Sequence, residues 1–148
     1  ANARIAGEPA NDLPLGAAGN DIRTDRFGID FLNVGVGNDV VAGGPGPDLH
    51  FGGNGSDFII HGPDGSESFG GLGNDFIQGG AGADTIQGNE GDDWIEGGDQ
   101  PDLLQGDSGN LFFKDTGNPP GNDVLIGQAG DDDYDNEGGD DIGIAGPG

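Results

Sequence analysis

The chain lacks several residue types, and each absence excludes a class of site. It has no cysteine, no methionine, one tryptophan, one tyrosine and two histidines in 148 residues. Without cysteine there is neither a disulfide framework nor a thiolate metal site, and two histidines are too few for a zinc or haem site made by this chain alone. No run of about 18 apolar residues occurs, so no segment is expected to insert into a membrane. The start, ANARIAGEPA, has no apolar core of the signal-peptide type.

Basic residues are also scarce, and this leaves the charge of the chain unbalanced. Lysine and arginine number 4 against 28 aspartates and glutamates, which gives a net charge of −24, while only 31% of the residues are hydrophobic. Such a composition normally predicts disorder, because burial cannot offset the conformational entropy that folding costs. Nucleic acids and anionic membranes would be repelled. The chain is therefore either disordered or neutralised by cations, and a metal ion is the obvious candidate.

Glycine is abundant instead, and it recurs in a fixed pattern. The stretch GGAGADTIQGNEGDDWIEGG, residues 79 to 98, repeats the nine-residue phrase G-G-x-G-x-D-x-U-x, in which U is apolar. This frame runs unbroken from Gly16 to Lys114 and resumes from Asn118 to Ile144, which makes 14 copies. Position 4 is glycine in 12 of the 14 copies.

Position 6 of the frame is aspartate in 12 of the 14 copies, and only Ser66 and Leu111 interrupt the series. The aspartates are Asp21, Asp30, Asp39, Asp48, Asp57, Asp75, Asp84, Asp93, Asp102, Asp123, Asp132 and Asp141. So regular a spacing is far beyond chance, even in an acidic chain.

With this spacing the chain resembles the RTX, or haemolysin-type, calcium-binding repeat, whose nonapeptide has the same form. The resemblance covers residues 16–144. It implies an all-β fold, a parallel β-roll in which two nonapeptides make one right-handed coil, x-U-x forms a strand and GGxGxD forms the turn. Residues 1–15 are then expected to be an N-terminal arm or linker, 16–114 coils of the roll, 115–117 an insertion and 118–148 further coils. The last residues look like the start of another repeat, so we expect a piece of a longer protein.

The residue types of the turn suit calcium. Glycine allows positive φ and lets carbonyl groups crowd inward, and Ca²⁺ takes about six to eight oxygen ligands from carboxylates and carbonyls. In the implied roll, turns that are two nonapeptides apart stack, so each ion should lie between two stacked turns and share an aspartate with each neighbour. The expected carbonyl ligands lie near Gly37, Gly55, Gly73, Gly80, Gly82, Gly91, Gly98, Gly121 and Gly130.

The position-6 residues sort into two columns. One is Asp21, Asp39, Asp57, Asp75, Asp93, Leu111 and Asp132, and the other is Asp30, Asp48, Ser66, Asp84, Asp102, Asp123 and Asp141. Each column has four adjacent aspartate pairs, among them 102/123 and 123/141, so about eight calcium ions are expected, which would reduce the net charge from −24 to −8. The inner position-8 side chains should form two rows: Val41, Ile59, Ile77, Ile95, Phe113 and Tyr134 in one, and Leu32, His50, Ser68, Ile86, Leu104 and Leu125 in the other.

One copy, residues 61–69, departs from the pattern. It has Ser66 in place of the aspartate and Ser68 in place of the apolar residue, while His50 fills a neighbouring inner position. The two histidines could indicate chemistry, but a poorly fitting core residue at His50 and a turn residue at His61 are the favoured interpretations.

Position 7 should point outward from the roll. In one sheet it holds Val40, Phe58, Phe76, Trp94 and Phe112. These side chains either stabilise the sheet by stacking on one another or form a docking face for another module or for a second copy of the chain. The row also leaves a neutral sugar open as a ligand.

The resemblance implies a bacterial module, secreted or at the cell surface, that is exported unfolded by a type I system and folds on calcium outside the cell. It is expected to support or dock another module of the same parent chain and to catalyse no reaction itself. The stretch from Trp94 to Gly148 is most similar to RTX segments of bacterial animal-type haem peroxidases. The alternatives are a structural or adhesive spacer of a cell-surface adhesin, and an accessory module of a secreted haem peroxidase, protease, lipase or epimerase.

Overall fold

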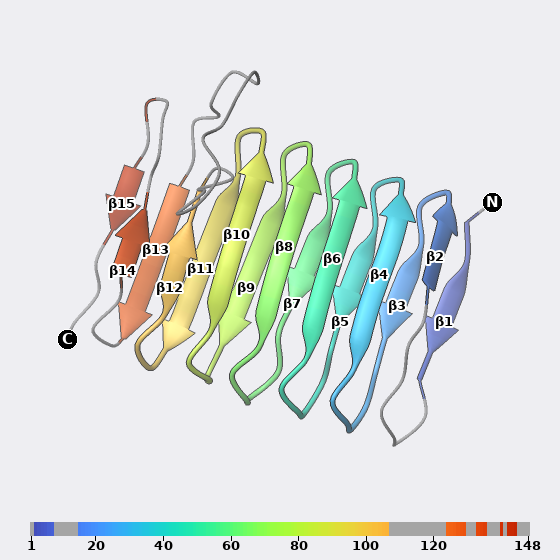
Figure 1. Cartoon of the computed structure of the whole chain (residues 1–148), viewed down its shortest axis with the longest axis horizontal. Helices are drawn as coiled ribbons and strands as arrows, with labels where there is room; N and C mark the ends of the chain where they lie inside the picture. The colour runs from blue at the N-terminus through green and yellow to red at the C-terminus, as the bar shows by residue number, and fades with distance from the viewer. Residues whose placement is uncertain are drawn as a thin grey trace, which may run out of the picture.

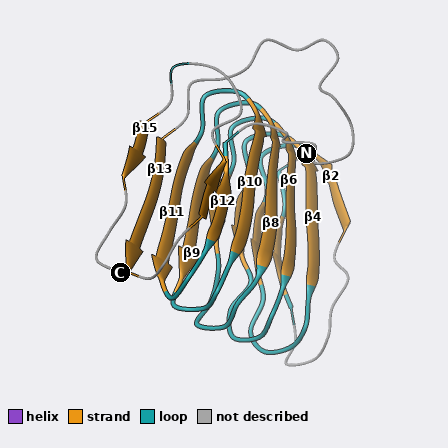
Figure 2. Ribbon diagram, turned by 60° about the vertical axis from the view of Figure 1, so that its left-hand side comes forward, coloured by secondary structure: helices purple, strands orange, loops and turns teal. Residues whose placement is uncertain are grey.

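The computed structural model of the chain describes residues 2–7, 15–106, 124–129, 133–135, 140 and 142–144. Within them the chain winds through two parallel β-sheets, with β1 (Arg4–Ala6) at one end of the stack and β15 (Ile142–Ile144) at the other (Figure 1). Figure 2 shows the two sheets as facing layers joined by turns. The expected all-β parallel roll is confirmed. This part of the chain contains no helix, and so none long and apolar enough to cross a membrane.

The strands alternate between the two sheets along the chain. The eight-stranded sheet contains, in spatial order, β1, β3 (Ile22–Thr24), β5 (Val40–Ala42), β7 (Phe58–Ile60), β9 (Phe76–Gly80), β11 (Trp94–Asp99), β13 (Val124–Ala129) and β15. The seven-stranded sheet contains β14 (Asp133–Asp135), β12 (Leu103–Gln105), β10 (Thr85–Glu90), β8 (Glu67–Leu72), β6 (Leu49–Asn54), β4 (Phe31–Val36) and β2 (Leu15–Ala18). Each coil therefore contributes one strand to each sheet.

The nine-residue phrase explains both the strands and the core. From β3 to β12 each strand begins directly after a position-6 residue, and paired residues are two nonapeptides apart, as in Val41 opposite Ile59. Because side chains alternate across a strand, the position-8 residue points inward while its neighbours point outward. The core is a thin seam of one or two side chains per strand: Leu32, Val34, Val41, Ile59, Ile77, Ile86, Ile95, Leu104 and Leu125, each at most 1% exposed.

The register changes after β12, and the expected inner rows are wrong beyond that strand. The two-nonapeptide spacing would place Phe113 opposite Ile95, but Leu125 lies there, and Leu104 lies opposite Tyr134. Strand β12 starts at Leu103 and β13 only at Val124, whereas β10 and β11 start one nonapeptide apart. The separation between these two strand starts is therefore more than a nonapeptide longer than that between β10 and β11.

The three-residue insertion expected at 115–117 is too short for this change of register. Residues 115–117 themselves, with Phe112 and Phe113, lie outside the described residues. The pairing of β11 with β13, and not the break in the repeat frame, therefore marks the boundary between the expected coils of residues 16–114 and those of residues 118–148.

The expected N-terminal boundary also shifts. Arg4–Ala6 already forms β1, which pairs with β3 and places Ile5 opposite Arg23. The roll therefore begins before residue 15, although the glycine-rich frame is not yet readable there.

Candidate metal sites in the stacked turns

Glycine is required in the turns both for conformation and for space. Gly55 and Gly73 have positive φ values of 133° and 123°. A Cβ on Gly73 would lie 2.2 Å from the carbonyl oxygen of Gly55, and a Cβ on Gly55 would lie 1.9 Å from that of Gly37. The backbone of each turn therefore packs directly against a carbonyl group of the turn one coil earlier, where no side chain fits.

The turns on the other edge of the roll pack in the same way. A Cβ on Gly98 would lie 1.9 Å from the carbonyl oxygen of Gly80, and a Cβ on Gly82 would lie 2.1 Å from the backbone nitrogen of Gly65. Rows of closely packed backbone therefore line both edges of the roll, beside the position-6 residues.

The aspartates at position 6 stack in columns, and the backbone holds one oxygen of each carboxylate. Oδ1 of Asp39, Asp57 and Asp75 accepts a hydrogen bond from the backbone N–H of the aspartate one coil earlier, at 2.6, 2.8 and 2.8 Å. In the second column the N–H of Asp84 donates to Oδ1 of Asp102 at 2.8 Å. These bonds fix the orientation of the carboxylate and direct the other oxygen into the roll.

That second oxygen is buried without a hydrogen-bond partner. This holds for Oδ2 of Asp39, Asp48, Asp57, Asp75 and Asp84, whose residues are at most 4% exposed. Glycine at position 1 makes room for it, since a Cβ on Gly70 would lie 2.3 Å from Oδ2 of Asp75. A buried anionic oxygen with no partner is costly, and a row of them requires either protons or cations.

The pKa values of these carboxyl groups also indicate that their charged form is costly in the metal-free fold. Burial raises the pKa of Asp75 from its ordinary value of 3.8 to about 8, although the hydrogen bond from the backbone N–H of Asp57 acts in the opposite direction. Burial likewise raises the pKa of Asp48 and of Asp57 to about 6. An adjacent cation would favour the charged form and lower these pKa values again.

Calcium fits this donor set. Each gap between stacked turns offers two carboxylates at most, together with backbone carbonyl oxygens such as those of Gly37 and Gly55. In the described part of the chain no group of three or more acidic, histidine or cysteine side chains is arranged to hold a metal ion. An ion between turns would therefore take most of its oxygens from the backbone, which suits a hard cation with many oxygen ligands and not a zinc-type site of nitrogen and sulfur.

Six adjacent aspartate pairs lie wholly within the described residues: 21/39, 39/57, 57/75, 75/93, 30/48 and 84/102. Asp123, Asp132 and Asp141, with Gly121 and Gly130, lie outside the described residues. The N–H of Val124 donates to the carbonyl oxygen of Asp93 at 2.8 Å, as the N–H of Trp94 does to that of Asp75 at 2.9 Å. The column of Asp93 therefore continues into β13, and the expected pairing of 102 with 123 is wrong.

A family model described as the RTX calcium-binding nonapeptide repeat (4 copies) matches residues 15–49, 26–59, 69–104, 87–110 and 120–142. The chain belongs to the RTX calcium-binding repeat family. Repeats of this family bind calcium, form structural modules and are typical of secreted bacterial proteins. No curated protein and no solved structure matches the chain.

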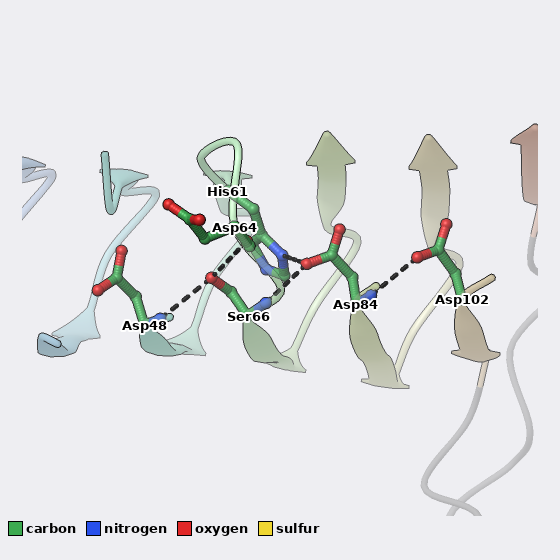
Figure 3. A network of polar contacts seen from close by, with 6 residues as sticks. All are labelled: Asp48, His61, Asp64, Ser66, Asp84 and Asp102. Carbon is green, nitrogen blue, oxygen red and sulfur yellow. Dashed lines mark hydrogen bonds and ion pairs between the residues drawn. The ribbon is translucent and has the colours of Figure 1, made fainter. Parts of the chain in front are cut away.

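One coil of the RTX roll has a polar network where its neighbours have an aspartate pair (Figure 3). The hydroxyl of Ser66 accepts the N–H of Asp48 at 3.1 Å, and the N–H of Ser66 donates to Oδ1 of Asp84 at 2.8 Å. Nδ1 of His61 lies 3.0 Å from the same oxygen. His61 lies in the turn between β7 and β8, as expected, but its side chain is buried and only 6% exposed.

His50 lies in the core of the RTX roll beside His61. It is fully buried, its ring stacks on that of His61 with centroids 4.8 Å apart, and neither of its ring nitrogens makes a hydrogen bond of normal geometry. Burial and, to a smaller extent, the neighbouring His61 lower the pKa of His50 to about 3, and the backbone of Glu67 opposes this shift only weakly. His50 is therefore a neutral, poorly satisfied core residue.

An outer apolar row crosses the eight-stranded sheet of the RTX roll. The rings of Phe58 and Phe76 stack with centroids 5.0 Å apart, and those of Phe76 and Trp94 with centroids 6.3 Å apart. Trp94 is 41% exposed. The position expected for Phe112 is occupied by Val124, because Val124 lies opposite Trp94. A hollow of about 490 Å³ lies between these side chains and the adjoining turns.

Two further features of the RTX roll were not found from the sequence. Arg23 occupies an inner position, 2% exposed, with Nη2 3.6 Å from Oδ2 of Asp21. The repeat frame marks Arg23 only as a poor fit to an apolar position. On the seven-stranded sheet Phe31, Phe51 and Phe69 form a second ring row with centroids 5.2 and 5.0 Å apart. Phe31 stands at position 7 of the repeat, whereas Phe51 and Phe69 stand at position 9, and this difference conceals the row in the sequence.

Proposed function

We propose that this RTX roll is a calcium-dependent folding module of a larger secreted bacterial protein, exported unfolded and folded outside the cell. The observation that carries the proposal is the row of buried carboxylate oxygens without hydrogen-bond partners, which includes Asp39, Asp57 and Asp75. The thin apolar seam is too small to offset both this cost and the conformational entropy. Calcium would neutralise the carboxylates and make metal binding part of the folding free energy.

The test is a calcium titration of the metal-free full chain at neutral pH, followed by circular dichroism. The metal-free chain should give a coil spectrum, and calcium should induce the strand signal, with at least six ions bound per chain, one for each aspartate pair in the described residues. Magnesium is the matched control, and it should substitute poorly because it requires a smaller octahedral site. A strand spectrum that persists in excess chelator at neutral pH would refute the proposal.

We further propose that the outer row of the eight-stranded sheet docks a neighbouring module of the same parent chain. Among the outward positions of its x-U-x segments, only Arg4 and Glu96 are charged. With eight strands about 4.8 Å apart and about 10 Å of outward-facing strand each, the face covers roughly 340 Å². A stable interface between separate proteins needs about 800 Å² per partner, so a second free copy would bind weakly. A covalently attached module has a high effective concentration and can use a smaller face.

The stacking geometry argues against a sugar ligand on this row. The ring planes of Phe58 and Phe76 differ by 13°, and those of Phe76 and Trp94 by 9°, so the ring faces lie against one another. A sugar would need those faces free. The rings offer mainly their edges to a partner, which suits an apolar protein surface. A spacer of an adhesin would need no such face, and this distinguishes it from a docking module.

A further inference from the structure

One gap in the second aspartate column lacks a carboxylate, and a histidine lies there instead. Ser66 stands one coil before Asp84, so the gap between these turns has one aspartate rather than two. His61 occupies position 1 of the same copy, where the adjacent copies of the column have Gly43 and Gly79. Its imidazole points to Asp84, with Nδ1 3.0 Å from Oδ1 (Figure 3).

The available space explains why His61 and Ser66 occur together. A Cβ on Gly79 would lie 2.6 Å from Oδ2 of Asp84, and a Cβ on Gly43 would lie 2.3 Å from Oδ2 of Asp48. In these copies a side chain at position 1 would therefore meet the carboxylate at position 6. Ser66 has no carboxylate, and this leaves room for an imidazole at residue 61.

We propose that His61 takes the place of a calcium ion between the turns of Ser66 and Asp84, so that a side chain closes this gap and no metal enters it. The inference rests on the proposed calcium function. The Nδ1–H of His61 donates to Asp84 where the neighbouring gaps would hold a cation, and stacking on His50 fixes the ring. The calcium sites of the second column are then divided into two blocks, with 30/48 on one side and 84/102 on the other.

The first column offers a parallel at its N-terminal end. One coil before Asp21 stands Ala3, whose N–H donates to Oδ1 of Asp21 at 2.7 Å. Here the buried Arg23 brings Nη2 to 3.6 Å from Oδ2 of Asp21. In both columns, an aspartate that follows a non-acidic residue contacts a basic side chain from inside the roll. A basic side chain of the protein therefore contacts the aspartate at each of these two places, where the pairing of carboxylates is incomplete.

The test compares the calcium stoichiometry of the full chain carrying Ser66→Asp with that of His61→Gly/Ser66→Asp, measured by equilibrium dialysis. Ser66→Asp completes the pair with Asp48, but its carboxylate meets the imidazole of His61, so this variant should gain at most one ion over the parent chain. The double variant also opens the gap beside Asp84 and should gain two. Ser56→Asp adds a carboxylate to an exposed turn position outside the columns and should gain none.

Equal ion counts in the single and the double variant would overturn the inference, whereas a parent chain that binds no calcium would refute the proposed function itself. A second measurement needs no substitution. In the calcium-saturated parent chain, NMR should detect an Nδ1–H of His61 that is protected from solvent exchange. The absence of a protected Nδ1–H in the calcium-saturated chain would mean that an ion displaces the ring, and it would overturn the inference in the same way.

Discussion

Protons and calcium should substitute for each other at the buried aspartates of the roll. The perturbation is removal of calcium at about pH 7.5, followed by acidification of the metal-free chain to about pH 4.5. Burial raises the pKa of Asp75 from 3.8 to about 8, and the pKa values of Asp48 and Asp57 to about 6. The metal-free folded state therefore binds protons at these groups in a pH range in which the unfolded chain releases them.

The sign follows from these raised pKa values. The stability that protonation gives the metal-free fold is fully present below about pH 4 and is lost as pH rises, through about 6 for Asp48 and Asp57 and through about 8 for Asp75. One pKa unit corresponds to about 1.4 kcal/mol, so Asp75 alone costs the metal-free fold roughly 6 kcal/mol at high pH. That is comparable to the whole stability of a small domain, which is about 5–15 kcal/mol.

The assay is circular dichroism of the metal-stripped chain at low concentration, with and without calcium, across this pH range. Strand signal should be absent at about pH 7.5 without calcium, return at about pH 4.5 without calcium, and be present at about pH 7.5 with calcium. The calcium concentration at the midpoint of the strand signal should fall as pH falls from about 8 to about 6, because protonation of the buried carboxyl groups already stabilises the metal-free fold. A midpoint that does not depend on pH would refute the assignment of buried carboxylates as ligands.

Two substitutions test the turns and the outer row. Gly73→Ala places a Cβ 2.2 Å from the carbonyl oxygen of Gly55 at a φ of 123°, so it should destabilise the calcium-loaded roll by at least about 1–3 kcal/mol. The control is Ser56→Ala at an exposed turn position, which should leave thermal melting in calcium nearly unchanged. Equal melting temperatures of the two variants would contradict the turn packing. Phe76→Thr/Trp94→Gln should leave the calcium midpoint nearly unchanged and weaken docking of the attached module, and a large rise in that midpoint would show the row to be structural. In the parent chain, the emission of Trp94, which is 41% exposed, should be red-shifted in the isolated monomer and move to the blue on docking.

The repeat spacing was enough to predict the strands and their stacking, because turns of fixed length leave little freedom in register. The spacing did not predict the strand pairing after β12, where more than one pairing is compatible with the same pattern. The stretch around Leu111 and Phe113 keeps the frame and supplies apolar residues, yet Val124 lies opposite Trp94, where the frame places Phe112. Counting copies in the sequence does not show which copy pairs with β11.

The contacts of His61 and Arg23 could not be read from the frame either. Each residue departs from the consensus, and a departure alone does not tell whether a side chain leaves the roll or turns into it. The direction was decided by packing, since Ser66 frees volume beside Asp84, and Asp21 offers an oxygen to a buried guanidinium. The contact of His61 with Asp84 joins two different copies, so the pattern within one copy does not contain it.

The carboxylate hydrogen bonds give the stack a direction. Each one runs from the backbone N–H of one coil to Oδ1 of the next, as from Asp39 to Asp57 and from Asp57 to Asp75. A roll that grows from its N-terminus therefore ends in a neutral backbone N–H that has no acceptor yet. The next coil supplies that acceptor with its carboxylate. A roll that grows from the other end would present a bare carboxylate to solvent at each step. The two ends of a partly formed stack therefore differ chemically, because one end presents a backbone donor and the other presents a carboxylate acceptor.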